Sequence, residues 1–293
     1  MVWLVVLVLT ATIALMNAPT SVEAWGRDGH IIICEIAESF LNASAAEGVS
    51  KLLPTSADGK LSNVCSWADE VKKTPGYEWS TTLHYVDTPN GACNYDYERD
   101  CVQHSKPDHC VAGAIHNYTA QLTGASLAAN NLTEALLFLA HFVGDIHQPL
   151  HCGFIGDFGG EDISVTWFNN SNTDLHRVWD SQIIMTTNEQ YFHDNSDNLA
   201  SALINNIKTV WSSEAANWTV CPQGAPPCTD TYAKESVKMA CQAAYANVGG
   251  TQITSGTTLA EPYFDSRYPT VEKRLAIAGV RLGAILNTIF KGP

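Results

Sequence analysis

Two histidine–aspartate pairs of identical spacing could bind a metal ion. His141 and Asp145 are four residues apart, and so are His176 and Asp180. On an α-helix this spacing puts both side chains on one face, about one turn apart. The sequence around the first pair is apolar nearly all round such a helix, which indicates that the helix is buried. A buried imidazole and a buried carboxylate need a hydrogen-bonded partner or a metal ion.

A third histidine follows the first pair closely. Pro149 ends the expected helix, and His151 comes soon after it, so this imidazole should converge with the pair. Nitrogen and oxygen ligands without a neighbouring pair of thiolates suit zinc. One histidine–aspartate pair alone is more often a core histidine bonded to its carboxylate. Two such pairs, with His151 between them, favour a metal site.

Other candidate ligands lie nearer the amino terminus. Asp69 follows an apolar run, and Lys72 lies one turn after it if the segment is helical. His84 stands in a second polar cluster, with Asp87 three residues on. Taken alone, each of these residues is more typical of a solvated or capping position than of a ligand.

Residues 1–24 are predicted to be a secretory signal peptide. Residues 2–16 form an apolar run too short to span a membrane comfortably, and small residues precede the expected cleavage site between Ala24 and Trp25. The usual basic start is missing. Cleavage there would give Trp25 a free α-amine, which can chelate a metal together with the carbonyl of the same residue. His30 follows five residues later, where alone it would be a histidine near a helix start.

Nine cysteines behind a signal peptide predict disulfide bonds, and the odd number leaves at least one thiol unpaired. Spacing does not reveal the connectivity, but Cys221 and Cys228, across a proline-rich loop, are the clearest local pair. Cys152 is the candidate free thiol. The other disulfide candidates are Cys34, Cys65, Cys93, Cys101, Cys110 and Cys241. Glycosylation sequons agree with passage through the secretory pathway and begin at Asn42, Asn117, Asn131, Asn169 and Asn217.

The mature chain, residues 25–293, is predicted to form a single mostly α-helical domain with a small β-hairpin. Hydrophobic residues make up 45% of the 293 residues, enough for a large core. One long helix is expected over 111–147, a short strand over 161–168, and helices near 197–217, 229–247 and 268–290. The last of these helices carries little polar chemistry and is expected to be core. No segment after the signal peptide is long enough to be a membrane helix.

The chain resembles the plant bifunctional nucleases over its whole mature length. These are the zinc-dependent single-strand nucleases related to mung bean nuclease, and the zinc-dependent phospholipases C are similar to them more distantly. The segments that carry the resemblance are WGRDGH, WADEVK, LHYVDTP, HFVGDIHQPLH, the Gly-Gly pair before the short strand, and LHRVWD. The resemblance implies a mostly α-helical fold with three zinc ions at the bottom of a cleft.

The resemblance also implies a ligand set for each zinc ion. One ion would be held by Asp69, His84, His141 and Asp145. A second would be held by the amine and carbonyl of Trp25, by His30 and by Asp145, which would bridge the two ions. The third would be held by His151, His176 and Asp180.

By the same resemblance, the chain is a secreted endonuclease that hydrolyses single-stranded DNA and RNA to 5′-phosphate products and also acts on 3′-nucleotides. A water activated by zinc is the expected nucleophile. Asp69, Asp145 and Lys72 are the candidate catalytic residues. Lys72 matches a position that contacts phosphate, whereas Tyr85 and Asp87 match positions that stack on and hydrogen-bond a base.

One position departs from the pattern of the family. The family usually has Gly-Gly-Asn before the short strand, with the amide helping to hold the base, but this chain has Glu161 in place of the asparagine. An ionised carboxylate only accepts hydrogen bonds, whereas an amide also donates them. Glu161 is therefore a candidate base contact of altered preference, unless its side chain simply points to solvent.

The net charge of −14 is the wrong sign for a protein that grips duplex DNA along a basic surface. Three zinc ions would bring about +6 into the site, so the cleft itself could still attract short unpaired strands. We therefore expect a secreted, vacuolar or endomembrane protein that acts as a monomer, without a membrane partner. Two alternatives remain open. One is a phospholipase C-type phosphodiesterase, in which Tyr85 and Asp87 would form a headgroup cage. The other is a non-catalytic glycoprotein whose histidine–aspartate pairs are structural.

Overall fold

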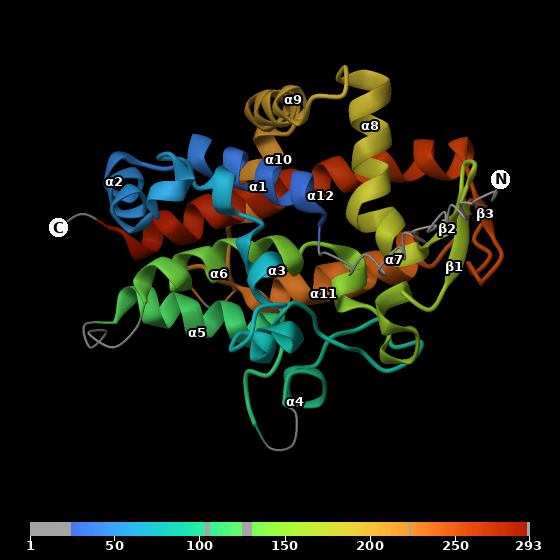
Figure 1. Ribbon diagram of the computed structural model, residues 1–293, viewed down its shortest axis with the longest axis horizontal. Helices are drawn as coiled ribbons and strands as arrows, with labels where there is room; N and C mark the ends of the chain where they lie inside the picture. The colour runs from blue at the N-terminus through green and yellow to red at the C-terminus, as the bar shows by residue number, and fades with distance from the viewer. Residues whose placement is uncertain (1–24, 103–105, 125–130, 223, 292–293) are drawn as a thin grey trace, which may run out of the picture.

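The computed structural model describes residues 25–102, 106–124, 131–222 and 224–291 (Figure 1). The fold is mostly helical with a small sheet, as the sequence predicted. Its α-helices are α1 (Arg27–Ser39), α2 (Ala43–Leu52), α3 (Trp67–Val71), α4 (Tyr97–Asp100), α5 (Val111–Thr123), α6 (Leu132–Asp145), α7 (Leu175–Arg177), α8 (Ile183–Tyr191), α9 (Ser196–Lys208), α10 (Ser212–Trp218), α11 (Thr229–Met239) and α12 (Glu261–Ile289). Its strands are β1 (Ser164–Trp167), β2 (Asn170–Asp174) and β3 (Thr258–Leu259).

The longest helix, α12, packs along α1 through the middle of the molecule (Figure 1). The two backbones approach closely at Gly279, where a β-carbon would lie 2.5 Å from Cβ of Ile36. Only glycine fits such a contact, and it brings the buried face of α1 against the core. That face also carries His30, so the packing of α1 on α12 sets the position of this histidine. No helix within the described ranges is both long and apolar enough to cross a membrane.

The helix expected over 111–147 is in fact two helices, α5 and α6, which lie side by side (Figure 1). α5 ends at Gly124, which is extended at the helix end. α6 begins after Asn131, whose side-chain oxygen caps the helix by accepting from the amide of Glu134 at 3.3 Å. The continuous apolar pattern hid these two boundary signals.

The short strand and hairpin are confirmed, with one addition. β1 pairs with β2 in an antiparallel hairpin, with Val165 opposite Thr173. β3, only two residues long and distant in sequence, pairs in parallel with β1 on its other side. Nothing in the pattern of so short a strand could have predicted it. β2 leads directly into α7, so the hairpin positions the second histidine–aspartate pair.

Two of the three expected carboxy-terminal helices have different bounds. The segment near 197–217 is broken at Thr209 into α9 and α10. α12 begins at Glu261 rather than near residue 268, because Pro262 suits the first turn of a helix, and it continues through Pro269. The third segment is α11, which continues into a π-helical turn, Ala240–Ala244.

The cysteines pair as four disulfides and one free thiol. Cys221 pairs with Cys228, as predicted, and Cys152 is free and buried. The remaining bonds are Cys34–Cys65, Cys93–Cys241 and Cys101–Cys110. The asparagines of all five sequons are exposed, which is the accessibility that glycosylation requires.

α12 also carries polar chemistry that the sequence did not reveal. Arg274 and Arg281 lie on it two turns apart, each only 4% exposed. Arg281 donates to both carboxylate oxygens of Glu235 in α11, at 2.6 and 2.8 Å, and Arg274 donates to one of them at 3.2 Å. The expectation that this helix is plain apolar core was wrong, because the carboxylate allows the two guanidinium groups to be buried.

His147 belongs to the same network. Its Nδ1 donates to the carbonyl of Val143 at 2.7 Å, and its Nε2 accepts from Arg281 at 2.9 Å. Arg274 donates to the His147 carbonyl at 3.0 Å. Burial, with Arg274 and Arg281 nearby, holds the pKa of His147 well below its usual range, so the ring is neutral. His147 therefore ties the turn after α6 to α12.

Glu235→Ala tests this network. The change leaves two buried guanidinium groups without their carboxylate. Breaking a buried ion pair usually lowers the free energy of unfolding by about 3–5 kcal/mol. Because the Glu235 side chain is 38% exposed, we expect the low end of that range, about 3 kcal/mol. The melting temperature should fall by about 6–12 °C, measured by calorimetry. The matched control is Glu214→Ala, which removes an exposed partner of Lys273 on the same helix and should cost less than about 1 kcal/mol. Equal shifts for the two variants would contradict the account.

Candidate metal centre

Eight side chains that the sequence singled out come together in three buried groups. Each group has three members, because His141 belongs to two of them. Within each group the ligand atoms all lie within 4.8 Å of one another. The groups are His30–Asp69–His141, His84–His141–Asp145 and His151–His176–Asp180. Residues from six different parts of the chain thus form one polar cluster inside the core.

α6 supplies the centre of the cluster. Every residue of this helix from Ala135 to Asp145 is buried, as its apolar sequence predicted. Asp145 faces histidines on two sides: its Oδ2 is 2.9 Å from Nδ1 of His84 and 3.4 Å from Nε2 of His141, and its Oδ1 is 3.3 Å from Nε2 of His30. Asp145 is thus placed as a carboxylate that two ions could share.

Asp69, on α3, lies across from Asp145. Its Oδ1 is 3.5 Å from His141 and 3.6 Å from His84, and its Oδ2 is 4.0 Å from His30. His30 therefore faces both carboxylates, although the resemblance joined it only to Asp145. The Cys34–Cys65 disulfide links α1 to the segment just before α3, which keeps the two elements in register.

The third group agrees with the set expected from the resemblance. His151 lies in the 3₁₀ turn Pro149–Cys152, and His176 lies in α7. Asp180 lies in a π-helical turn, Val178–Gln182, a rare element that is frequent at functional sites. Its carboxylate oxygens are 3.2 Å from Nε2 of His176 and 3.8 Å from Nε2 of His151. The sequence did not point to Gln148, which is buried and donates to Asp180.

Trp25 is fully buried beside the third group. The amide of the next residue, Gly26, donates to the carbonyl of Asp180 at 2.8 Å. A β-carbon on Gly26 would overlap Oγ of Ser181, so glycine lets the chain pass this close without displacing that side chain. The first described residue therefore lies close to the cluster in the chain and in space, and His30 follows one turn into α1.

The donor atoms of the cluster lack the hydrogen bonds that buried polar atoms normally make. Within the described residues, eight such atoms have no partner: Nδ1 and Nε2 of His30, Oδ2 of Asp69, Nε2 of His84, Nε2 of His141, Oδ1 of Asp145, Nε2 of His151 and Oδ2 of Asp180. Unpaired buried donors and acceptors are costly. Each residue can give a metal ion one ligand atom, so bound metal ions would satisfy most of these atoms, although only one of the two ring nitrogens of His30.

Backbone carbonyls hold three of the rings by the opposite nitrogen. Nδ1 of His141 donates to the carbonyl of Cys65 at 2.9 Å, and Nδ1 of His151 donates to that of His84 at 2.7 Å. Nδ1 of His176 donates to the carbonyl of Gly159 at 2.8 Å. In the neutral ring these bonds keep the proton on Nδ1, so that Nε2 can present a lone pair to the cluster.

The protonation states of four of the eight side chains suit metal binding directly. Burial lowers the pKa of His30, His84 and His151 well below the usual range, so these rings are neutral, the form that binds metals. Burial alone would raise the pKa of Asp69, but His141 outweighs it and holds that pKa well below its usual range.

His176 differs from these rings. Burial lowers its pKa, but Asp180 outweighs the burial and raises it to about 9. The imidazolium is therefore the form stable at neutral pH while only protein faces it. A metal bound to this group must displace a proton.

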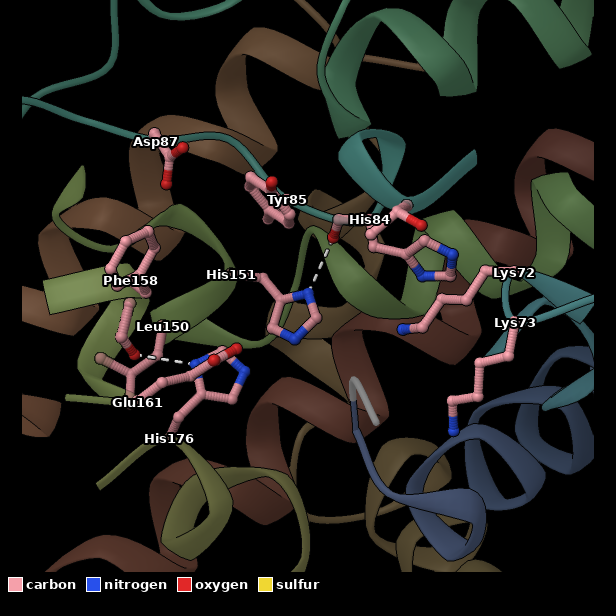
Figure 2. A pocket seen from close by; sticks show the side chains of 12 residues that line it. Lys72, Lys73, His84, Tyr85, Asp87, Leu150, His151, Phe158, Glu161 and His176 are labelled. Atoms are coloured by element: carbon pink, nitrogen blue, oxygen red, sulfur yellow. Dashed lines mark hydrogen bonds between the residues drawn. The ribbon is translucent and has the colours of Figure 1, made fainter. Parts of the chain in front are cut away.

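Three of the eight candidate ligands, His84, His151 and His176, line a cavity of about 380 Å³ (Figure 2). Lys72 and Lys73 lie at one end, and Asp87, Phe158 and Glu161 lie at the other, with His151 between them. The cavity therefore has a basic end and an acidic, aromatic end. All four residues that the sequence assigned to substrate, including Tyr85, line it.

Lys72 connects this cavity to the metal groups. It follows Asp69 by one turn, as expected, and its Nζ lies 2.6 Å from Oδ1 of that carboxylate. The Lys72 side chain is only 12% exposed. Glu161 is exposed at the surface and also lines the cavity, so its side chain does not simply point away from the site.

Phe158, Lys73 and Thr81 line the cavity although the sequence gave no reason to choose them. Phe158 is 61% exposed and has a left-handed backbone, with φ 50°. Such a conformation is strained for a residue with a β-carbon. The sequence signal that could have pointed to Phe158 is an aromatic residue directly before the Gly-Gly pair.

The two carboxylates at the acidic end influence each other. Burial, Asp157 and Glu161 together raise the pKa of Asp87 to about 6. The pKa of Glu161 is also raised, chiefly because the walls of the cavity remove part of its carboxylate from water although the residue reaches the surface. Part of the acidic end therefore changes charge near pH 6, within the range where many enzymes work.

Comparison with known proteins agrees with this site. The S1/P1 Nuclease family matches residues 25–291. The chain belongs to the S1/P1 nuclease family. "Endonuclease 4" of Arabidopsis thaliana is 48% identical over 272 residues, which cover 91% of this chain and 89% of the relative. "Endonuclease 3" of the same plant is 45% identical over 293 residues, covering 98% and 96%. "Nuclease P1" of Penicillium citrinum is 32% identical over 271 residues, covering 90% and 97%.

Membership of the S1/P1 nuclease family decides between the readings that the sequence left open. The chain is a nuclease whose substrate is nucleic acid, rather than a phospholipase or a non-catalytic glycoprotein. Its histidine and aspartate groups fit metal binding. The plant nuclease resemblance seen in the sequence is confirmed.

Gly159→Ala should weaken metal binding in the third group. Gly159 has φ 61°, and a β-carbon there would lie 2.4 Å from the Leu150 carbonyl oxygen and 3.2 Å from Nδ1 of His176. The backbone must shift, and with it the carbonyl that orients His176. Metal analysis of the purified variant should show loss of the ion held by this group, with activity falling alongside.

The matched control is Gly91→Ala. Gly91 also has a positive φ, 75°, but its β-carbon would meet open space. In both variants the positive φ destabilises the alanine backbone by about 1–2 kcal/mol. Only the first should lose metal, and a full metal complement in Gly159→Ala would refute the steric argument.

Proposed function

We propose that this nuclease is a secreted endonuclease of single-stranded DNA and RNA. It leaves 5′-phosphate ends, also hydrolyses 3′-nucleotides, and works with three zinc ions. The observation that carries the proposal is the cluster of unpartnered buried donor atoms that reaches, through His84, His151 and His176, one cavity with a basic end and an aromatic end. Residues 1–24, which lie outside the described residues, serve as the signal peptide.

The residues that the sequence resemblance assigned would hold the three ions. Asp69, His84, His141 and Asp145 would hold one ion. The amine and carbonyl of Trp25, together with His30 and Asp145, would hold the second. His151, His176 and Asp180 would hold the third. Imidazole and carboxylate donors without thiolates favour zinc, and so few protein ligands leave coordination positions for water and substrate.

Bound zinc ions supply a water acidic enough to attack at neutral pH and neutralise the charge that builds up on the phosphate. The chain contributes position. Lys72, fixed by its bond to Asp69, presents a cation at the basic end of the cavity for the phosphate. In hydrolysis the water oxygen would form a bond to phosphorus as the P–O3′ bond breaks. The proton that the water loses balances the one that the 3′ oxygen takes up as it leaves as a hydroxyl, and the phosphate stays on the 5′ side.

The other end of the cavity explains a preference for unpaired strands. Tyr85 and Phe158 offer ring faces on which a base can stack, and such stacking accepts any base. A base must leave its duplex to enter, which costs least in a single strand. The net charge of −14 also disfavours a long duplex along the surface.

The deciding experiment combines metal analysis with activity. Purified mature protein should contain three zinc ions and should cleave single-stranded DNA and RNA faster than duplex DNA, releasing 5′-phosphate ends. Asp145→Asn should lower kcat by more than about 100-fold, because one carboxylate serves two ions. Asp162→Asn, an exposed acidic control, should be unchanged. A single zinc ion, or full activity in Asp145→Asn, would rule out the three-ion site.

A second prediction concerns the new amino terminus. One extra alanine before Trp25 turns the amine into an amide and moves the free amine by about 3.8 Å. A zinc–nitrogen bond of about 2.0–2.1 Å cannot tolerate that shift. The extended protein should therefore lose one zinc ion and most of its activity, measured after mass spectrometry has confirmed its terminus. Trp25→Phe with the native terminus is the control and should keep its zinc.

A third prediction concerns the acidic end. Ionised Asp87 accepts hydrogen bonds from base amino groups, so KM for 3′-nucleotides should fall as pH rises through about 6. Glu161→Gln removes a neighbouring charge and lowers the pKa of Asp87, so the fall should occur at lower pH. The measurement is KM against pH for four 3′-nucleotides. Identical profiles in Glu161→Gln and wild type would place Glu161 outside base recognition.

A further inference from the structure

A second hollow lies at the turn of the β1–β2 hairpin, and none of the candidate metal ligands lines it. Its volume is about 740 Å³. Its walls are turn residues 167–170 and three residues of α8, namely Thr186, Glu189 and Gln190. Figure 1 places the hairpin at one edge of the molecule, beside α8 and the first turns of α12. The catalytic site uses none of these residues.

One of the glycosylation sequons forms part of this wall. Asn169 is exposed, and it is followed by Asn170 and Ser171, which complete the Asn-x-Ser sequence. It occupies the turn between the paired residues Trp167 and Asn170. A sugar attached to its amide would therefore start at the rim of the hollow.

The aromatic residues just before the sequon are held rigidly. Trp167 is 6% exposed, and its Nε1 donates to Oγ1 of Thr186 at 3.3 Å. Phe168 packs edge-on against Trp167, with ring centroids 5.1 Å apart, and against Phe264 at 6.4 Å. It also has φ 50°, at a turn position where hairpins favour glycine. The turn thus carries a fixed ring in a strained conformation next to the sequon.

We propose that this hollow is the docking site of the N-linked glycan on Asn169. The first N-acetylglucosamine residues lie against the partly exposed ring of Phe168, which Trp167 supports from beneath, and hydrogen-bond to side chains of α8. The C–H face of a pyranose is apolar and packs on aromatic rings. Thr186, Glu189 and Gln190 supply the donors and acceptors that sugar hydroxyls and acetamido groups need. A wall of rings with a few polar groups is the usual make-up of a binding site.

Docking here stabilises an element on which the metal centre depends. β2 runs directly into α7, where Asp174 caps the helix by accepting from the amide of Arg177 at 2.7 Å. His176 follows two residues after that cap. A glycan that joins the hairpin to α8 would hold the start of α7 against local unfolding. The inference rests on the proposed secretion but not on the proposed catalysis.

The test uses full mature protein secreted with high-mannose glycans, and mass spectrometry should find Asn169 occupied. Asn169→Gln and Ser171→Ala remove the same glycan by different changes. Each should lower the melting temperature by about 2–4 °C. Asn117→Gln, at an exposed sequon on α5, is the matched control and should leave it unchanged. Trimming the wild-type glycan to its first N-acetylglucosamine should retain most of the stability.

A double-variant comparison separates docking from other effects of the glycan. Phe168→Leu keeps an apolar side chain but removes the ring. It should lower the melting temperature more in glycosylated protein than in the Asn169→Gln background. An unoccupied Asn169, equal shifts for all sequon variants, or the same effect of Phe168→Leu in both backgrounds would overturn the proposal. Nuclease activity is assayed separately, so loss of the glycan site and loss of the proposed catalysis remain distinguishable.

Discussion

The desolvation of the side chains around Asp145 is the constraint on which the rest of the structure depends. Carboxylates and imidazoles removed from water lose several kcal/mol each unless a charge or a hydrogen bond replaces the solvent. Here Asp145, Asp69 and His141 are almost completely buried, and several of their donor atoms face one another without hydrogen bonds. Contacts within the protein alone do not offset the free-energy cost of removing these groups from water. Metal ions would, so metal binding and folding of this centre are expected to be coupled.

The same constraint explains why so much of the fold surrounds one helix end. The carboxyl end of α6 and the turn after it carry Asp145, His147 and His151 in quick succession, and the three side chains face different partners. Asp145 meets His30 and His84, and His151 meets the third group. His147 turns the other way and joins the buried arginines of α12. A shift of this turn would disturb the metal groups and the arginine network together.

Some features of the fold and the site were predictable from the sequence and others were not, because they leave different kinds of signal in the sequence. Spacing on one face of a helix placed His141 with Asp145 and His176 with Asp180, and the local turn chemistry predicted Cys221–Cys228. Boundaries were less predictable, because the expected helix ran through Gly124 and Asn131, where α5 ends and α6 begins. β3 and Gln148 were not predictable, since each depends on contacts between segments distant in sequence. Arg274 and Arg281 were missed because two arginines on an apolar helix look like solvated residues until Glu235 is placed beside them.

At the acidic end of the cavity this chain departs from the residue pattern of the family. The resemblance assigns a base contact to the position of Glu161, but the residue there is a carboxylate beside a second carboxylate, Asp87. Both have raised pKa values. When both are ionised they can only accept, which favours bases with amino groups over those that present carbonyls alone. Phe158, by contrast, offers a ring face that accepts any base. Stacking would therefore set how strongly an unpaired base is held, and the two carboxylates would set which edge of the base is preferred.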